Sequence, residues 1–194
     1  MPKQVDHDSR RAHLADAVCS LVSTRGLESV TLREVATEAG VSMGAVQRCF
    51  RTKAEMLLFA QEHVNREVAA RARARIGDGA AAVMLEQALT ALLAVDDPGL
   101  VSARVWIAFT AQAVVDPALA AAHEEHYAGL TEMLTVLLKA AQDSGEVRTG
   151  LDLRQEVDAV LTLADGLTLQ VLLGRHTPES AVAELRRQTR HLWA

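Results

Sequence analysis

Aromatic residues, proline and cysteine are all scarce in this chain of 194 residues. Strands favour aromatic side chains, and the chain has only three Phe, two Trp and one Tyr, so a sheet-rich fold is not expected. Four Pro and eleven Gly exclude a collagen-like or linker-dominated chain, and 49% hydrophobic against 23% charged residues excludes a disordered one. Ala and Leu, both strong helix formers, dominate. The composition therefore predicts an all-α globular protein.

The sequence suggests neither a disulfide framework nor a targeting segment. Its two cysteines, Cys19 and Cys49, do not have the spacing of metal ligands, and we expect reduced thiols. The first residues, MPKQVDHDSRR, contain no apolar run of the kind found in secretion signals. The longest apolar stretch, 80–95, is interrupted by Glu86 and Gln87 and is too short to span a bilayer. We expect a cytoplasmic protein that is not embedded in a membrane.

The formal net charge of −5 would argue against a nucleic-acid partner if the charge were evenly spread. Residues 1–76, however, contain 12 Lys and Arg against 9 Asp and Glu, a net charge of +3. Residues 77–194 contain 8 against 16, a net charge of −8. Such asymmetry suggests that the N-terminal part carries a basic nucleic-acid-binding face.

Helical periodicity and helix-boundary residues divide the chain into helices. Thr31 and Glu34 have the spacing of a capping box, in which the hydroxyl accepts from the Glu34 amide and the carboxylate reaches back. Asp97-Pro98, Asp116-Pro117 and Thr177-Pro178 each place a capping residue before a proline at the first helical position. The predicted all-α fold has nine helices and no strand, and the helices cover 9–25, 31–39, 42–50, 53–76, 80–94, 98–115, 117–143, 153–174 and 178–192.

Residues 31–50 have the parts of a helix-turn-helix. Ala36 is small where the two helices cross, and Gly40 suits a turn that requires positive φ. The predicted inner face is apolar and consists of Val35, Val41, Val46 and Phe50. The predicted outer face, called the recognition face below, consists of Ser42, Met43, Ala45, Gln47 and Arg48. Gln and Arg can pair bidentately with adenine and guanine edges in a major groove. The alternative is an ordinary helical hairpin, which accounts less well for the capping box, the turn glycine, Ser42 and Lys53 all occurring at matching positions.

The string T-L-R-E-V-A-x-x-A-G-V-S-x-G-x-V-x-x-x-F-x-x-K-x-x-M-L, from Thr31 to Leu57, resembles the TetR/AcrR family of bacterial transcriptional regulators. The resemblance covers about residues 10–60. Asp165-Gly166-Leu167-Thr168-Leu169 loosely resembles the BetI-type C-terminal domain of that family. The resemblance implies a homodimeric, ligand-responsive DNA-binding protein, usually a repressor.

The family's DNA contacts carry over by position. The resemblance implies that Thr31 and Arg33 touch phosphate or a neighbouring base, and that Lys53 binds phosphate. Four residues match the end of the helix that enters the groove, namely Ser42, Met43, Gly44 and Ala45. The chain departs from the family pattern at Gln47, Cys49 and Arg51. Since Gln47 replaces a tyrosine, operator preference is expected to differ from that of relatives, while Arg51 adds a charge able to reach phosphate.

The larger C-terminal part offers few aromatic residues to line an apolar pocket. The candidate effector-binding residues are Phe59, Trp106, Phe109, Thr110, Tyr127 and Asp165, and ordinary core packing is the alternative for each. Asp165 lies in an apolar run and needs a partner. Arg104, a donor from a second subunit and a ligand cation are the candidates, and structural pairing is the favoured use.

The helix predicted over 153–174 is apolar on nearly its whole circumference, which suggests a subunit interface shared with the last helix and its seam of Val182, Leu185 and Leu192. Burial within one subunit is the alternative. His123 and His126 could ligate a metal, but no third ligand is evident, and solvated helix surface is favoured. No catalytic motif, metal site or cofactor is expected.

Together these observations predict a DNA-binding domain over 1–52 and a ligand-binding and dimerisation domain over 53–194. The expected function is that of a homodimeric repressor which binds a palindromic double-stranded DNA operator and is released by a small-molecule effector. A transcriptional activator of the same fold remains an alternative. So does a helical protein that binds a small molecule or metal without operator activity. The sequence identifies neither the effector nor the operator.

Overall fold

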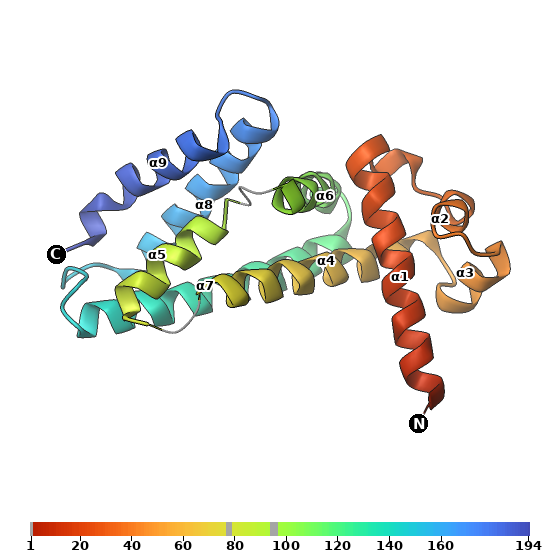
Figure 1. The fold of residues 1–194 in the computed structure, drawn as a ribbon, viewed down its shortest axis with the longest axis horizontal. Coiled ribbons are helices and arrows are strands. Elements are labelled where there is room, and N and C mark those ends of the chain that lie inside the picture. Colours follow the sequence, from red (N-terminus) through yellow and green to blue (C-terminus); the bar gives the residue numbers. More distant parts are fainter. Residues whose placement is uncertain (1, 77–78, 94–96) are drawn as a thin grey trace. The chain divides into compact units, whose positions relative to one another are not determined.

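The structure, a computed structural model, describes residues 2–76, 79–93 and 97–194 (Figure 1). Over these ranges it contains nine α-helices: α1 Pro2–Arg25, α2 Leu32–Glu38, α3 Met43–Cys49, α4 Lys53–Ile76, α5 Ala81–Ala91, α6 Asp97–Ala113, α7 Pro117–Asp143, α8 Leu153–Leu172 and α9 Pro178–Gln188. Two short 3₁₀ turns occupy Leu27–Ser29 and Thr189–Leu192. An isolated bridge between Val147 and Trp193 is the only β pairing in the described residues. The all-α prediction is confirmed.

The helix boundaries agree with the sequence where capping residues mark them. Thr31 Oγ1 accepts from the Glu34 amide at 3.1 Å, and Thr177 Oγ1 accepts from the Ser180 amide at 3.2 Å. Asp116 Oδ1 likewise accepts from the backbone at the start of α7. The reverse half of the expected capping box is wrong, because the Glu34 carboxylate lies 3.4 Å from Arg25 Nη1 instead. The expected cap at 97–98 rests on side chains outside the described part of the chain.

The two largest differences from the predicted helix ends, at the start of α1 and the end of α9, have physical reasons. Helix α1 begins at Pro2 rather than Ser9, since proline suits the first helical turn and no helix breaker separates the two positions. The polar residues before Ser9 lack the apolar periodicity on which the prediction relied. Helix α9 ends at Gln188 rather than 192, because the last residues tighten into the 3₁₀ turn.

The helices form two compact units, and each is described by itself. The first comprises the residues up to 67 together with 104–124, and the second comprises 68–103 together with 125–194. Side chains from α1 to α4 and from α6 bury the first unit's core, including Leu14, Val18, Leu21, Val35, Val46, Phe50, Met56 and Phe109. This core holds α2 and α3 against α1, so the predicted helix-turn-helix has a rigid backing.

The second unit's core is built by α5, α7, α8 and α9. It includes Leu85, Leu89, Leu134, Leu138, Val157, Leu161, Leu185 and Leu192. Leu185 and Leu192 are only 2% and 1% exposed because they are buried in the core of their own chain. The prediction that they lie in a subunit interface is therefore wrong. Helix α8 is not buried all round either, since Leu169 is 37% exposed and Leu173, which directly follows the helix, is 58% exposed.

None of the helices in the described ranges combines the length and the apolar character needed to cross a membrane.

Candidate nucleic-acid interface

The turn between α2 and α3 is built by two adjacent backbone features. Gly40 has a φ of +65°, a conformation that side-chain-bearing residues rarely adopt, and the Val41 amide donates to the Ala36 carbonyl at 2.9 Å. Ala36 is 5% exposed, which agrees with its predicted place at the helix crossing. Ser42 then caps α3 by accepting from the Ala45 amide at 3.2 Å. The chain therefore reverses direction sharply and starts a second helix at once.

Helix α3 buries one face and exposes the other. Val46 and Phe50 are 0% and 1% exposed, whereas Val41 is only half-buried and Cys49 takes a buried position beside them. On the recognition face, Ser42, Met43, Gln47 and Arg48 are exposed and Ala45 is half-buried. The outer surface of α3 is thus open along its length to a partner.

Gly44 leaves the outer surface of α3 without a side chain near the N-terminal end of the helix. A Cβ atom added there would lie 3.8 Å from Arg48 Nη1 and 4.0 Å from Ser42 Oγ. These are ordinary van der Waals contacts, so an alanine fits the folded chain. The missing side chain therefore matters to what approaches α3 rather than to its packing.

A cap that was not predicted orients the start of α4. Thr52 Oγ1 accepts from the Glu55 amide at 3.0 Å, and the Glu55 carboxylate accepts from the Arg51 amide at 2.9 Å. The spacing of Thr52 and Glu55 is that of a capping box and is visible in the sequence. Lys53, the first residue of α4, is exposed next to this cap.

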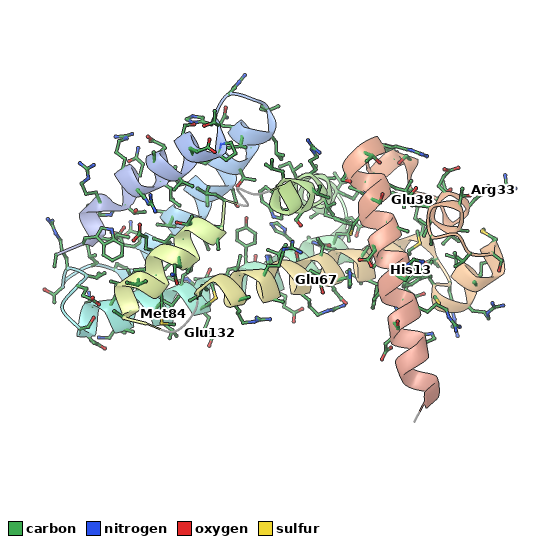
Figure 2. The ribbon with its side chains drawn as sticks, in the orientation of Figure 1. His13, Arg33, Glu38, Glu67, Met84 and Glu132 are labelled. Carbon is green, nitrogen blue, oxygen red and sulfur yellow. The ribbon has the colours of Figure 1, made fainter. Side chains whose placement is uncertain are left out.

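Acidic side chains near the helix-turn-helix are engaged with partners behind it. Glu34 lies 3.4 Å from Arg25, Glu55 lies 3.5 Å from Arg11, and Glu38 accepts from the Ser20 hydroxyl at 2.6 Å. Figure 2 labels Glu38 and Arg33, the latter on the outer side of α2. In the part of the chain that the structure describes, no carboxylate pairs with Arg33, Arg48, Arg51 or Lys53. The exposed surface is therefore left positively charged.

Helix α1 holds the unit together from behind. His13 Nε2 donates to the Ala39 carbonyl at 3.0 Å, which ties α1 to the end of α2 (Figure 2). His63 of α4 lies 2.9 Å from Asp16. Burial and the nearby Asp16 raise the pKa of Cys19 to about 12, so this thiol stays protonated and unreactive. A capped helix with an open, cationic outer face on a fixed support is the arrangement of a helix-turn-helix DNA-binding protein.

Comparison with known proteins gives this class a family. Residues 14–59 match the family described as bacterial regulatory proteins of the tetR family. Residues 81–194 match the C-terminal part of the BetI-type transcriptional repressors. The chain belongs to the TetR family of transcriptional regulators, which bind DNA and are not enzymes.

Individual relatives agree with this assignment. The HTH-type transcriptional regulator PksA of Bacillus subtilis is 30% identical over 89% of this chain and 83% of its own length. The HTH-type transcriptional regulator BetI of Paraburkholderia phymatum is 36% identical over 61% of this chain and 62% of its own. A transcriptional regulator from Rhodococcus sp. Rha1 has a similar structure, with a TM-score of 0.82 and 29% identity over 94% of this chain and 95% of that one.

The structure places the candidate effector residues in both units. Phe59, Trp106, Phe109 and Thr110 lie in the first, and Tyr127 and Asp165 lie in the second. Phe109 is 2% exposed, while Phe59, Trp106 and Thr110 are half-buried. The Phe59 ring lies 5.5 Å from the Phe50 ring, so it also contributes to the packing of α4 against the end of α3.

Asp165 receives a partner that the sequence did not suggest. The Tyr127 hydroxyl of α7 donates to the Asp165 carboxylate of α8, and both side chains are half-buried. Burial and this hydrogen bond raise the pKa of Tyr127, so the phenol remains protonated and keeps donating. No sequence pattern links residues this far apart on two helices, which explains why Tyr127 was not among the expected partners.

Proposed function

We propose that this chain is a homodimeric repressor that binds a palindromic operator and is released from it by a small-molecule effector. Residues 1–52 would read the operator, and residues 53–194 would bind the effector and form the dimer. The observation that carries the proposal is the exposed recognition face on a capped and rigidly backed α3. The match of residues 81–194 to BetI-type repressors favours repression over activation.

Each part of the outer surface has a role in this proposal. Thr31, Arg33 and Lys53 contact phosphates or the adjoining base and fix the register of the protein on the duplex. Ser42, Met43, Gly44 and Ala45 form the small end of α3 that enters the major groove. Gln47 and Arg48 read base edges through hydrogen bonds, and Arg51 adds a phosphate contact.

Dimerisation is supported by the exposed side of α8. Leu169 and Leu173, the residue that directly follows the helix, form an apolar patch there, and Thr162 and Ala159 are exposed about two and three turns before Leu169. A Cβ atom added at Gly166 would meet nothing within 4 Å, so a second helix can approach closely at this point. A two-fold dimer places its recognition helices about 34–36 Å apart, one turn of the duplex.

Release of the protein from DNA by an effector requires only a moderate coupling free energy between effector binding and DNA binding. A hundredfold loss of DNA affinity corresponds to a coupling free energy of about 2.7 kcal/mol, within the usual allosteric range. A regulator from Saccharomonospora viridis with a similar fold, at a TM-score of 0.86 and 20% identity, was solved in complex with choline. In this chain the candidate effector residues remain Phe59, Trp106, Phe109, Thr110, Tyr127 and Asp165.

The proposed function is tested by selecting duplexes that the protein binds from a random library. We expect an enriched palindrome whose half-sites are separated by about one helical turn. Failure to enrich any sequence, or enrichment of a single half-site, would contradict operator binding by a dimer. Placing the enriched site between a promoter and a reporter gene separates repression from activation, since a repressor lowers expression.

The dimer surface is tested by Gly166→Arg, whose Cβ atom would meet nothing within 4 Å in the single chain and whose long side chain is expected to block a close approach of two α8 helices. The matched control is Gly129→Arg on α7, where an added Cβ atom also meets nothing within 4 Å. Sedimentation is expected to give a dimer for the wild type and the control and a monomer for Gly166→Arg. If both Gly166→Arg and Gly129→Arg are dimers, the dimer interface does not include the exposed side of α8.

A further inference from the structure

A groove runs between α5 and α9 of the second unit, which lie side by side in Figure 1. Its largest hollow has a volume of about 640 Å³, within the range of small-molecule sites. Apolar side chains from both helices and from the residues after α9 line it, namely Val83, Leu89, Leu185 and Trp193. Two smaller hollows share Arg186 with it. None of the six candidate effector residues lines these three hollows, so the groove is separate from the proposed effector site.

The wall that Trp193 contributes is fixed in place by the loop that follows α7. The Arg148 amide donates to the Leu192 carbonyl at 2.9 Å, and Arg148 Nε donates to the Trp193 carbonyl at 3.0 Å. The Ala194 amide donates to the Glu146 carbonyl at 3.1 Å. Because these bonds hold the backbone on both sides of Trp193, this end of the hollow is formed before a ligand arrives, which lowers the cost of binding.

The groove is basic although the part of the chain that forms it is acidic. Residues 77–194 carry a net charge of −8. Three of their eight Lys and Arg residues nevertheless line the largest hollow, namely Arg186, Arg187 and Arg190. The lining contains a single carboxylate, that of Glu86. The charge of the groove is therefore opposite in sign to that of its surroundings, and it favours an anion.

One of these three positive charges is uncompensated among the described residues. Arg186 Nη2 lies 3.0 Å from the Glu86 carboxylate, a pair that joins α9 to α5. Arg187 donates to the Glu184 carboxylate through Nε at 2.8 Å and through Nη2 at 2.6 Å. The exposed Arg190 side chain has no carboxylate partner in the part of the chain that the structure describes. One spare positive charge suits a ligand with one negative charge.

The two hydroxyl groups of the lining are bonded to their own helices. Thr90 Oγ1 donates to the Glu86 carbonyl at 2.9 Å, and Thr189 Oγ1 donates to the Leu185 carbonyl at 2.9 Å. Neither hydroxyl is therefore a free donor. Arg190 is the cation of the lining that can pair with an anion without competition from a carboxylate in the described residues.

We propose that this groove binds a small amphipathic monoanion, namely a carboxylate with an apolar body. The carboxylate pairs with Arg190, whose planar guanidinium matches two carboxylate oxygens. The apolar body lies against Val83, Leu185 and Trp193, which removes apolar surface from water. Binding at this groove requires neither DNA nor an effector, so the inference goes beyond the proposed function.

Naphthylacetate and naphthylethanol test the charge of the ligand, because they contain the same number of carbon atoms and only the first is an anion. Calorimetry with the DNA-free protein gives both dissociation constants. The wild type is expected to bind naphthylacetate about 5-fold more tightly, the preference that a well-formed exposed ion pair gives. Arg190→Gln is expected to lose this preference. The matched control is Arg154→Gln on α8, which removes an exposed positive charge outside the groove and is expected to keep the preference.

Val83→Asp tests the apolar wall, since it places a negative charge where the apolar body is expected to lie. Val83 is 50% exposed, so the folded chain has room for the change. The matched control is Val101→Asp on α6, which adds the same charge at a residue that is 43% exposed and lies outside the groove. Val83→Asp is expected to weaken naphthylacetate binding at least about 5-fold, and Val101→Asp less than about 2-fold.

Other occupants of the groove give different results, and each of these overturns the inference. Equal binding of the two probes by the wild type, or the same preference in Arg190→Gln, means that Arg190 holds no anion. Binding of neither probe leaves an acidic segment of a protein as the occupant. Sedimentation detects a further case, in which Val83→Asp lowers the mass of the protein relative to the wild type and Val101→Asp does not, and the groove is then covered by a second copy of the chain.

Discussion

The guanidinium carbon of Arg11 lies 4.3 Å from the centroid of the Phe59 ring, which joins α1 to α4 by a cation–π contact. The same carbon lies 4.8 Å from the centroid of the Phe50 ring at the end of α3. Arg11 Nη2 also lies 3.5 Å from the Glu55 carboxylate. One side chain therefore holds together three of the helices that position the recognition face.

Replacing Arg11 by lysine is expected to lower the free energy of unfolding by about 1 kcal/mol. Lysine keeps the charge but cannot lay a planar group over two rings while reaching Glu55. Urea unfolding provides the measurement. The matched control is Arg25→Lys, whose ion pair with Glu34 is exposed and is expected to change stability by less than about 0.5 kcal/mol. Equal stability of Arg11→Lys and the wild type would remove this role of Arg11.

Gly44→Ala is expected to leave the unfolding temperature unchanged or slightly raised, because the added methyl group makes only ordinary contacts and alanine favours helices. Operator affinity is expected to fall at least tenfold, since the methyl group stands between α3 and the floor of the groove. Unfolding and operator titration are measured on the same preparation. Normal affinity would show that α3 does not approach the DNA at Gly44.

His191 gives the stability of the second unit a dependence on pH. Its Nε2 lies 2.8 Å from the Glu156 carboxylate, and its Nδ1 donates to the Gln188 carbonyl at 2.9 Å. The bond with Glu156 raises the pKa of His191 in the folded chain. The stabilisation is therefore complete below the unfolded pKa of about 6.5 and is lost as the pH rises through the raised folded value.

The measurement compares the unfolding temperatures of the wild type and His191→Gln at about pH 6 and about pH 9. The wild-type advantage is expected to be larger at the lower pH and small throughout, below about 1 kcal/mol, since the side chain is 53% exposed. An advantage that grows with pH would mean that the neutral imidazole is the stabilising form.

The parts of the fold that the sequence predicted well are those set by local chemistry. Thr31, Ser42 and Thr177 cap helices as their side chains suggest, and Gly40 adopts the positive φ that its position in the turn requires. Helices α4 and α7 have the predicted bounds. Each of these features depends on residues within one turn of one another, so the sequence contains the needed information.

Features that depend on distant parts of the chain were not predicted. The bond from Tyr127 to Asp165 and the contact of Arg11 with Phe59 join helices far apart in the sequence. Periodicity shows that Leu185 and Leu192 are apolar, but it cannot distinguish a core from a subunit interface, and the structure places both in the core. The sequence likewise does not show that the Oε1 atom of Gln61 is buried without a hydrogen-bond partner among the described residues.

In the proposed complex with DNA, the recognition face reads bases while Lys53 binds the phosphate backbone. Gln47→Ala and Arg48→Ala are expected to lose about 1–3 kcal/mol of binding free energy on the selected operator and far less on random duplex. Lys53→Ala is expected to weaken binding to both duplexes and to lower the slope of log affinity against log salt by about one.

The most direct test is a titration of the wild type and these three variants with operator and with random duplex over a range of salt concentrations. Gln47→Ala and Arg48→Ala are expected to reduce the ratio of specific to non-specific affinity. Lys53→Ala is expected to leave this ratio nearly unchanged and to make the salt dependence shallower. Equal losses on both duplexes for all three variants would contradict base reading by α3.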